Sequence, residues 1–167
     1  MFPNKISLIG MPSSDKTNIG RALADKLGYD FFDLDSMVEQ KENKSLITIL
    51  EENGAQYFLN IECSFLTELK PDKRVVISTA GSIIYHNEAM NWLKTNSVIC
   101  FIDTDYKIIE SRLLDKPKAV VGLKEKGLKR LWDERLPVYR DWSDFKIKTD
   151  SKDIKILVDE IITRLNK

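Results

Sequence analysis

Residues 10–17, GMPSSDKT, combine residue types that could hold phosphate groups. They follow the pattern GxxxxGK[ST], except that Asp15 stands where the second glycine belongs. In this pattern backbone N–H groups surround the phosphate oxygens, the lysine reaches the outer phosphates, and the hydroxyl binds Mg²⁺. We therefore predict that the loop binds a nucleotide and that Thr17 is also a metal ligand. The predicted nucleotide-binding residues of the loop are Gly10, Ser13, Ser14, Asp15, Lys16 and Thr17.

Asp15 imposes two costs on such a loop. Glycine permits a close approach to the phosphate and a positive φ, which aspartate tolerates less freely. A carboxylate about 5 Å from a phosphate oxygen adds a repulsion of roughly 3 kcal/mol at an effective dielectric near 20. That repulsion weakens binding by about 100-fold, which does not forbid it if Asp15 points outward. The alternative is a loop that now serves only as a turn between a strand and a helix.

Two further carboxylates, Asp33 and Asp35, stand in the segment FFDLDS. They are two residues apart at the end of a predicted strand, so we expect both side chains to point to the same side. One carboxylate near Mg²⁺ and one near an acceptor hydroxyl would suit phosphoryl transfer. The alternative is a polar strand end in which Asp35 caps the next helix.

Short apolar strands alternate with helical patterns along the chain. This alternation predicts an α/β fold, a three-layer α/β/α sandwich with a five-stranded parallel sheet. Such sheets bind ligands at the carboxyl ends of their strands, where residues 10–17, 33–35 and 79–82 fall. The predicted strands lie within 5–10, 29–35, 74–79, 97–103 and 144–149, the last at an edge. The predicted helices cover 17–27, 34–43, 46–53, 55–70, 87–95, 105–114, 127–140 and 152–166, whereas 115–127 has an irregular pattern.

Composition excludes several other classes of protein. The chain has 167 residues, of which 43% are hydrophobic, so we expect one domain with a substantial core. Its 26 basic and 26 acidic residues cancel, which gives no electrostatic support for binding nucleic acid or a membrane surface. Two cysteines without CxxC spacing favour reduced thiols in a cytoplasmic protein. A single histidine nearly excludes histidine-based catalysis.

The order of these motifs resembles that of the shikimate kinase family, which belongs to the P-loop kinases. The resemblance extends over almost the full length. ISLIGMPSSDKTNIGRALADKLGYDFFDLD is similar to the family's strand, phosphate loop, helix and Asp-x-Asp segment. STAGSI stands where the family has three glycines, and ESRLLDKPKAVV stands at its adenine-contacting arginine and lid. The most specific match is DERLPVYRDWSDFKIKTD, which resembles the family's Glu-Arg-x-Pro-x-Tyr segment.

The resemblance implies a role for each matching residue. The cofactors would be ATP and Mg²⁺, with Asp33 near the metal. Asp35 would contact the acceptor hydroxyl as the candidate base, and Gly81 would line the acceptor pocket. Arg112 would pack on adenine. Arg135 would pair with a carboxylate of the acceptor, unless it instead forms an exposed salt bridge with Asp133.

Three departures from the family pattern lie near the expected acceptor or lid. The arginine of Phe-Arg-x-x-Glu is replaced by Leu59, although Glu62 is retained. The segment of three glycines reads Thr79-Ala80-Gly81 here, so two of the glycines are replaced and two side chains are added. The lid arginine is replaced by Lys118, which keeps the charge but loses the planar fork; we predict a catalytic role for it.

Two functions remain open on this basis. The first is an active kinase of the amino-acid-biosynthesis type that transfers the ATP γ-phosphoryl group to a small hydroxylated carboxylate, shikimate or a related acceptor. The second is a catalytically impaired pseudokinase that binds nucleotide or a protein partner. The retained set of charged site residues favours the kinase, and a salt bridge between Asp15 and Lys16 would favour the pseudokinase. We expect one domain over residues 1–167, with a lid at about 115–127, that acts as a monomer.

Overall fold

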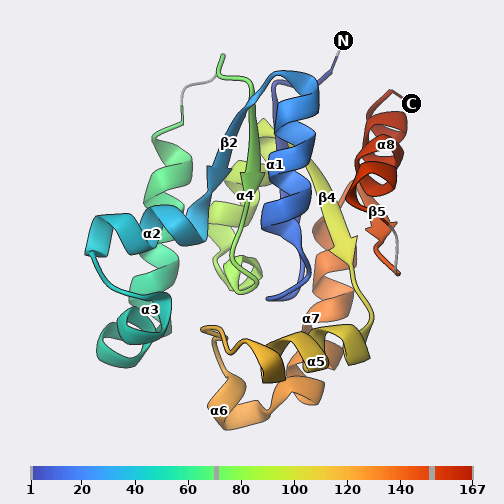
Figure 1. The fold of residues 1–167 in the computed structure, drawn as a ribbon. Helices are drawn as coiled ribbons and strands as arrows, with labels where there is room; N and C mark the ends of the chain where they lie inside the picture. The colour runs from blue at the N-terminus through green and yellow to red at the C-terminus, as the bar shows by residue number, and fades with distance from the viewer. Residues whose placement is uncertain (1, 70–71, 151–152, 167) are drawn as a thin grey trace.

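A computed structural model describes residues 2–69, 72–150 and 153–166. Its centre is a sheet of five strands, all parallel, in the order β2-β3-β1-β4-β5. The predicted α/β/α class and the edge position of the last strand are therefore confirmed (Figure 1). The strands are β1 (Lys5–Ile9), β2 (Asp30–Asp33), β3 (Val75–Ser78), β4 (Val98–Asp103) and β5 (Phe145–Lys148).

The break predicted between the helices over 46–53 and 55–70 is present inside the element α3, at Gly54, whose φ of 80° and ψ of 173° are not helical. The helices otherwise follow the predicted pattern with one difference. The predicted irregular segment contains a short helix, α6. The helices of the described residues are α1 (Lys16–Leu27), α2 (Leu34–Glu42), α3 (Leu46–Thr67), α4 (Asn87–Asn96), α5 (Tyr106–Asp115), α6 (Leu123–Lys126), α7 (Leu128–Trp142) and α8 (Ile154–Leu165), with a 3₁₀ turn η1 (Ile83–Tyr85).

The three central strands, β1, β3 and β4, are almost fully buried, so the sheet is covered on each side. On one face, Leu8 and Cys100 pack in a cluster with Leu23 of α1 and Val158 of α8. The opposite face packs against α3, α4 and α7. Alternation along each strand sends neighbouring side chains to opposite faces, which explains the continuous apolar runs. The result is a sheet held between two helical layers (Figure 1).

The carboxyl ends of the strands bring the predicted chemical segments together. The last residue of β2, Asp33, lies opposite Ser78 of β3, which in turn lies opposite Leu8 of β1. Gly10 then begins the loop with φ at 149°, and a Cβ there would stand 2.7 Å from the carbonyl oxygen of Ile102. Only glycine fits this close approach, so Gly10 fixes where the loop leaves the sheet.

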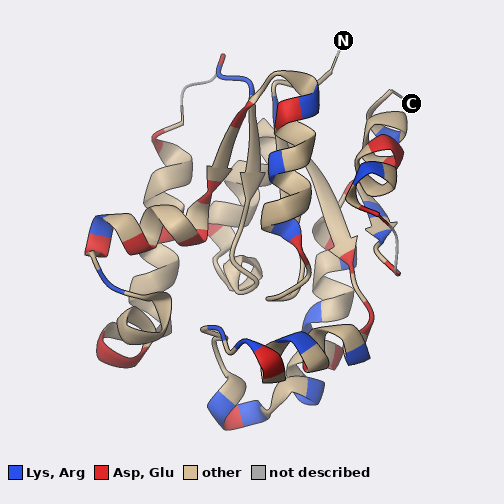
Figure 2. Cartoon of the chain, in the orientation of Figure 1, with Lys and Arg blue, Asp and Glu red and all other residues tan. Residues whose placement is uncertain are grey.

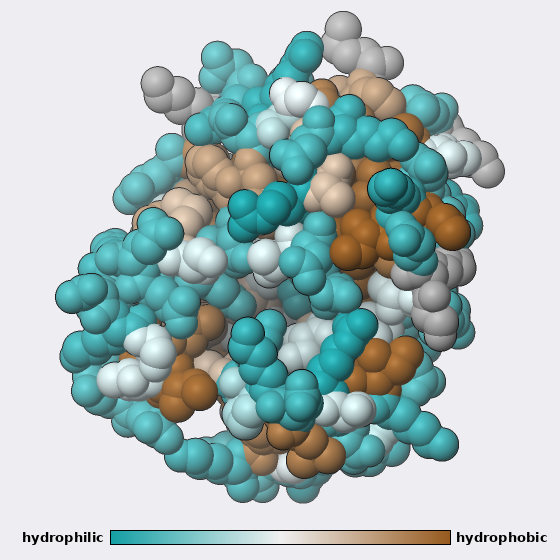
Figure 3. Space-filling view, in the orientation of Figure 1, coloured by the Kyte–Doolittle hydropathy of each residue, from teal (hydrophilic) through white to brown (hydrophobic). Residues whose placement is uncertain are grey.

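The surface carries charges of both signs, and a few large apolar side chains are exposed, Leu114 the most. Basic and acidic residues are interspersed over most helices (Figure 2), and the face in Figure 3 is mainly hydrophilic. Within the described residues, no helix combines the length and the hydropathy needed to cross a membrane.

Candidate active site

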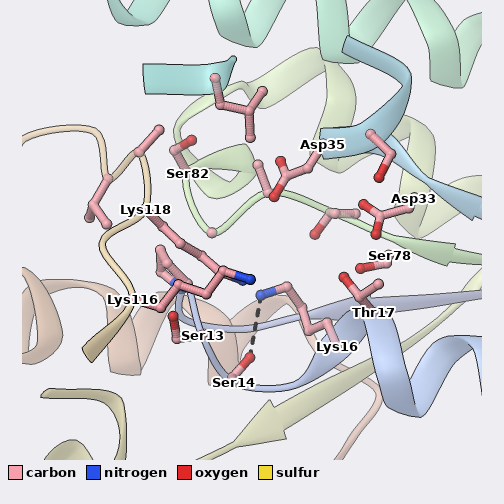
Figure 4. Close-up of a pocket in the computed structure, with 18 of the residues that line it drawn as sticks. Ser13, Ser14, Lys16, Thr17, Asp33, Asp35, Ser78, Ser82, Lys116 and Lys118 are labelled. Atoms are coloured by element: carbon pink, nitrogen blue, oxygen red, sulfur yellow. Dashed lines mark hydrogen bonds between the residues drawn. The ribbon is translucent and has the colours of Figure 1, made fainter. Parts of the chain in front are cut away.

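A cavity of about 700 Å³ opens at the carboxyl ends of the strands (Figure 4). Its walls come from the phosphate loop, the β2–α2 junction, the segment after β3, the segment after α5, and α7. Gly10, the first residue of the loop, is absent from the lining. The other predicted site residues all line this cavity: Ser13, Ser14, Asp15, Lys16, Thr17, Asp33, Asp35, Gly81, Arg112, Lys118 and Arg135.

Lys16 is buried at the start of α1 and is held by the loop itself. Its Nζ donates to the carbonyl oxygens of Gly10 at 2.9 Å and Met11 at 2.8 Å, and to Ser14 Oγ at 3.3 Å. The pKa of Lys16 is lowered to about 8, chiefly by burial; Asp35 opposes the shift and Lys118 adds to it. The amine ends of Lys16 and Lys118 point toward one another in Figure 4. Two cations that converge in a cavity form a suitable site for a polyanion.

Asp35 lies in the first turn of α2, not on the strand. The prediction that Asp33 and Asp35 share one side of a strand is thus wrong in its geometry, because β2 ends at Asp33. Both still line the cavity, since the helix turns Asp35 back over the strand end. The capping alternative is also wrong: Asp33 holds the N-cap position, without a side-chain cap bond.

Asp35 is the most perturbed carboxylate that lines the cavity. Its Oδ1 is buried without a hydrogen-bond partner among the described residues. Burial raises the pKa of Asp35 to about 6; Lys16 counters this shift and Asp33 adds to it. A carboxylate with a pKa near neutrality is suited to accept a proton at physiological pH.

The Asp15 carboxylate forms its ion pair with Arg112 and not with Lys16. Asp15 adopts the left-handed conformation, φ 71° and ψ 15°, as the N-cap residue of α1. Its carboxylate lies 3.3 Å from Nη2 of Arg112 and accepts a hydrogen bond from Asn18 Nδ2 at 2.8 Å. Nη1 of Arg112 also donates to the Ser13 carbonyl oxygen at 2.9 Å. The arrangement that would have favoured a pseudokinase, an Asp15–Lys16 salt bridge, is therefore not the one present.

Arg135 of α7 is fully buried. The alternative of an exposed ion pair with Asp133 is therefore wrong, and Asp133 instead pairs with Lys129 on the surface. The guanidinium of Arg135 donates to the Val121 carbonyl oxygen at 2.6 Å and to the Tyr85 hydroxyl at 3.2 Å. Its Nη1 is buried without a partner among the described residues. A buried charged donor without a partner is costly, which indicates that a ligand acceptor belongs there.

The departures near the expected acceptor side have clear structural consequences. Leu59 is buried in an apolar cluster with Phe58 and Ala80. Glu62 Oε1 accepts from the Ala80 N–H at 2.7 Å, while Oε2 is buried without a partner among the described residues. Burial, followed by the charge of Asp35, raises the pKa of Glu62 to about 8. Glu62 therefore favours the protonated form near neutral pH.

Gly81 has a structural role besides the predicted one. A Cβ at this position would stand 2.4 Å from Pro12 Cδ in the phosphate loop. Its carbonyl oxygen accepts a hydrogen bond from the buried hydroxyl of Tyr139. The third residue of the expected triple-glycine segment is thus retained where the two loops touch.

Two cavity residues were given no role of their own from the sequence. Ser78 and Ser82 line the cavity from the end of β3 and the segment that follows. Ser78 ends a buried strand next to a predicted acidic pair, which is a signal that could have been used. Asn18 stands three residues after Asp15, the spacing of neighbours on one helix face. The partnership of Asp15 with Arg112 joins positions far apart in the chain and leaves no such local signal.

Comparison with known proteins identifies the family. The sequence model of the shikimate kinase family matches residues 12–166. The chain belongs to the shikimate kinase family. It is 30% identical to a shikimate kinase of Persephonella marina over 96% of this chain and 98% of the relative, and 36% identical to one of Staphylococcus haemolyticus over 96% and 93%. The structure of shikimate kinase from Acinetobacter baumannii in complex with shikimate is similar with a TM-score of 0.88 and 28% identity, covering 99% of this chain and 94% of that one.

Family membership places the chain among ATP-dependent phosphotransferases that act on a hydroxyl group. It does not favour the pseudokinase alternative. The five-stranded parallel sheet agrees with those of the family's solved structures. Family membership does not by itself identify the acceptor or the role of each residue, because Asp15, Leu59 and Ala80 depart from the pattern expected of the family.

Proposed function

We propose that this shikimate kinase relative transfers the γ-phosphoryl group of ATP to a hydroxyl of shikimate or a closely related small carboxylate. The observation that carries this proposal is the unpartnered Nη1 of Arg135, buried beside the same cavity as Lys16 and Asp35. A guanidinium matches a planar carboxylate, and a fully buried one discriminates strongly against a neutral ligand. The relative from Acinetobacter baumannii, whose structure contains shikimate, supports the choice of acceptor.

The nucleotide end of the cavity supports binding of a triphosphate. Lys16 would contact the outer phosphates, and Lys118 would approach the transferred group from the opposite side. Both donate positive charge where negative charge is concentrated during phosphoryl transfer. The loop hydroxyls of Ser13 and Ser14, together with the loop N–H groups, would complete the contacts with phosphate.

Thr17 and Asp33 are the residues suited to hold Mg²⁺. They supply one hydroxyl and one carboxylate oxygen to the same cavity, which is the hard donor set that Mg²⁺ prefers. No group of three acidic, histidine or cysteine residues in the described ranges could hold a metal by itself. A site of two protein oxygens agrees with an ion that is bound largely through phosphates and water. When bound, Mg²⁺ would neutralise charge on the transferred phosphate.

Asp35 is the proposed general base. Its unpartnered Oδ1 is available to accept a hydrogen bond from an acceptor hydroxyl. The pKa of about 6 means that the carboxylate is mostly ionised at pH 7 while remaining an effective proton acceptor. A hydroxyl bound between Asp35 and the terminal phosphate would be both oriented and deprotonated as the bond to phosphorus forms.

Residues 115–127 are proposed to act as a lid within a single domain. Val121 is held by Arg135, and Lys124 of α6 pairs with Glu51 of α3 at 2.9 Å. The first contact joins the lid to α7 and the second joins it to α3. A closed lid would exclude water, which protects ATP from hydrolysis.

Measurement of ADP release with shikimate and with its methyl ester tests this proposal. We expect turnover with shikimate and a loss of at least about 100-fold in kcat/KM with the uncharged ester, because the ester cannot form the charged pair. In an Arg135→Met variant, kcat/KM for shikimate should fall to about the value for the ester. The difference in kcat/KM between the two acceptors should then disappear.

Two results would contradict the proposal in different ways. Binding of MgADP without turnover of shikimate or other small hydroxy acids would favour the pseudokinase. Absence of nucleotide binding would show that the phosphate loop is only a turn. Arg135→Lys serves as the matched variant, since it keeps the charge but loses the planar guanidinium. We expect its kcat/KM for shikimate to lie between those of the unmodified protein and Arg135→Met.

A further inference from the structure

The contact between the phosphate loop and α5 brings two charged residues together outside the cluster around Lys16. Arg112 comes from α5, which lies across the sheet end next to the start of α1 (Figure 1). One guanidinium nitrogen binds the backbone carbonyl of Ser13 at 2.9 Å, and the other lies 3.3 Å from the Asp15 carboxylate. A single side chain therefore fastens the loop by its backbone and by the residue that replaced its glycine.

The conformation and contacts of Asp15 also show that its carboxylate is held in place. Its positive φ of 71° is one that glycine adopts without strain and that aspartate tolerates better than most residues. The second oxygen of its carboxylate is occupied by Asn18 at 2.8 Å. Both oxygens are thus engaged by donors on α1 and α5. The carboxylate that should repel phosphate is held by these donors and its charge is balanced.

We propose that Arg112 is a positioning residue that makes the Asp15 carboxylate compatible with a bound polyphosphate. This role is distinct from any contact of Arg112 with the base, and it rests on the proposed binding of nucleotide by this loop. Without Arg112, the negative charge would lie uncompensated at the phosphate site. The loss of Arg112 should therefore be harmful mainly while residue 15 is charged.

A double-mutant cycle in nucleotide and polyphosphate binding separates these roles. The variants are Arg112→Gln, Asp15→Asn and their combination; asparagine tolerates the positive φ and keeps an oxygen for Asn18. The probes are MgADP and magnesium tripolyphosphate, which has no base to contact Arg112. For tripolyphosphate we expect Arg112→Gln to weaken binding by about tenfold alone, and by no more than about twofold in the Asp15→Asn background. For MgADP we expect the same coupling plus a constant loss in both backgrounds from any contact with the base.

Salt dependence and a control variant distinguish this electrostatic role from a general loss of loop structure. The effect of Arg112→Gln on tripolyphosphate should shrink as ionic strength rises, because the contact is partly exposed. Lys26 also lies on α1, and Lys26→Gln breaks its exposed pair with Asp159 of α8, so this variant should leave binding unchanged. Equal losses from Arg112→Gln in both backgrounds would overturn the proposal, as would failure of the unmodified protein to bind either probe. Because no acceptor is used, these outcomes are independent of whether shikimate is the substrate.

Discussion

The nucleotide end and the acceptor end of the cavity both depart from the expected pattern, but the substituted residues differ in whether they find polar partners. At the nucleotide end, Asp15 replaces a glycine and finds Arg112 and Asn18 as partners. At the acceptor end, Leu59 stands where an arginine is expected and is buried in an apolar cluster. Three buried polar atoms are without a partner among the described residues: Asp35 Oδ1, Glu62 Oε2 and Arg135 Nη1.

At the nucleotide end, other residues of the protein pair with the substituted residue. At the acceptor end, the unpartnered polar groups require a ligand or a proton. A buried carboxylate without a partner lowers its cost by taking up a proton, which agrees with the raised pKa of Glu62. A buried guanidinium cannot lose its charge under ordinary conditions, so the unpartnered Nη1 of Arg135 is suited to an acceptor on a ligand. The acceptor end is therefore the part of the site where affinity and specificity should be most sensitive to change.

Replacement of Asp35 by asparagine should have the largest effect. We expect kcat to fall by roughly 10²–10⁴-fold, because the carboxylate that accepts the hydroxyl proton is lost while the shape is kept. In the unmodified protein, kcat should rise with pH through about 6 as Asp35 ionises. Steady-state ADP release from pH 5 to 8 measures both effects.

The control for this change is Asp33→Asn, which removes the neighbouring carboxylate but not the proposed base. Asp33→Asn should raise the Mg²⁺ concentration needed for half-maximal rate while the rise of kcat with pH persists. If Asp35→Asn retained both the rate of the unmodified protein and the rise of kcat near pH 6, Asp35 would not be the general base.

Glu62→Gln should remove a dependence of stability on pH. Burial raises the pKa of Glu62 from its ordinary value of 4.5 to about 8 in the folded chain. Between these values the unfolded chain has released the proton and the folded chain retains it, so the free energy of unfolding falls as pH rises. We expect a decline of a few kcal/mol from pH 5 to 8 in the unmodified protein.

Urea unfolding at several pH values measures that decline. In Glu62→Gln the slope should be much smaller, because no proton is exchanged at this position. Glu52→Gln is a suitable control, since its carboxylate is half exposed and pairs with Lys44 at 2.5 Å on the surface. An equally steep slope in Glu62→Gln would mean that this acid is ionised and paired in the folded protein.

The sequence predicted local and repeated features more accurately than long-range ones. Strand and helix alternation was sufficient for the parallel sheet, and the GxxxxxKT spacing for a loop between β1 and α1. Asp33 and Asp35 were correctly expected in one cavity but for the wrong reason, because the strand ends earlier than its pattern indicates. Periodicity reports which residues lie on a face, but a strand end is decided by the helix that follows.

Charge partners far apart in the chain had no comparable signal. Asp15 and Arg112 were each noted from the sequence, yet nothing local relates them. Arg135 was expected by family resemblance, whereas its full burial depends on the packing of α7 against η1 and the lid. Burial of a charged residue is a property of the assembled layers, so it enters only with the fold.

Leu59→Arg should have the smallest effect. It would give the acceptor end an internal charge partner, as Arg112 does for Asp15 at the nucleotide end. Leu59 and Glu62 are three residues apart on α3, where side chains are neighbours, so the new guanidinium could pair with Glu62 and face the acceptor. We expect KM for shikimate to fall by about tenfold with little change in kcat, since the added contact stabilises ground state and transition state alike. Leu59→Met, which keeps the apolar cluster, is the matched control and should leave KM unchanged, and urea unfolding would show that each variant folds. If Leu59→Arg folded but left KM unchanged, the acceptor would not approach this wall, and Arg135 alone would account for recognition of the carboxylate.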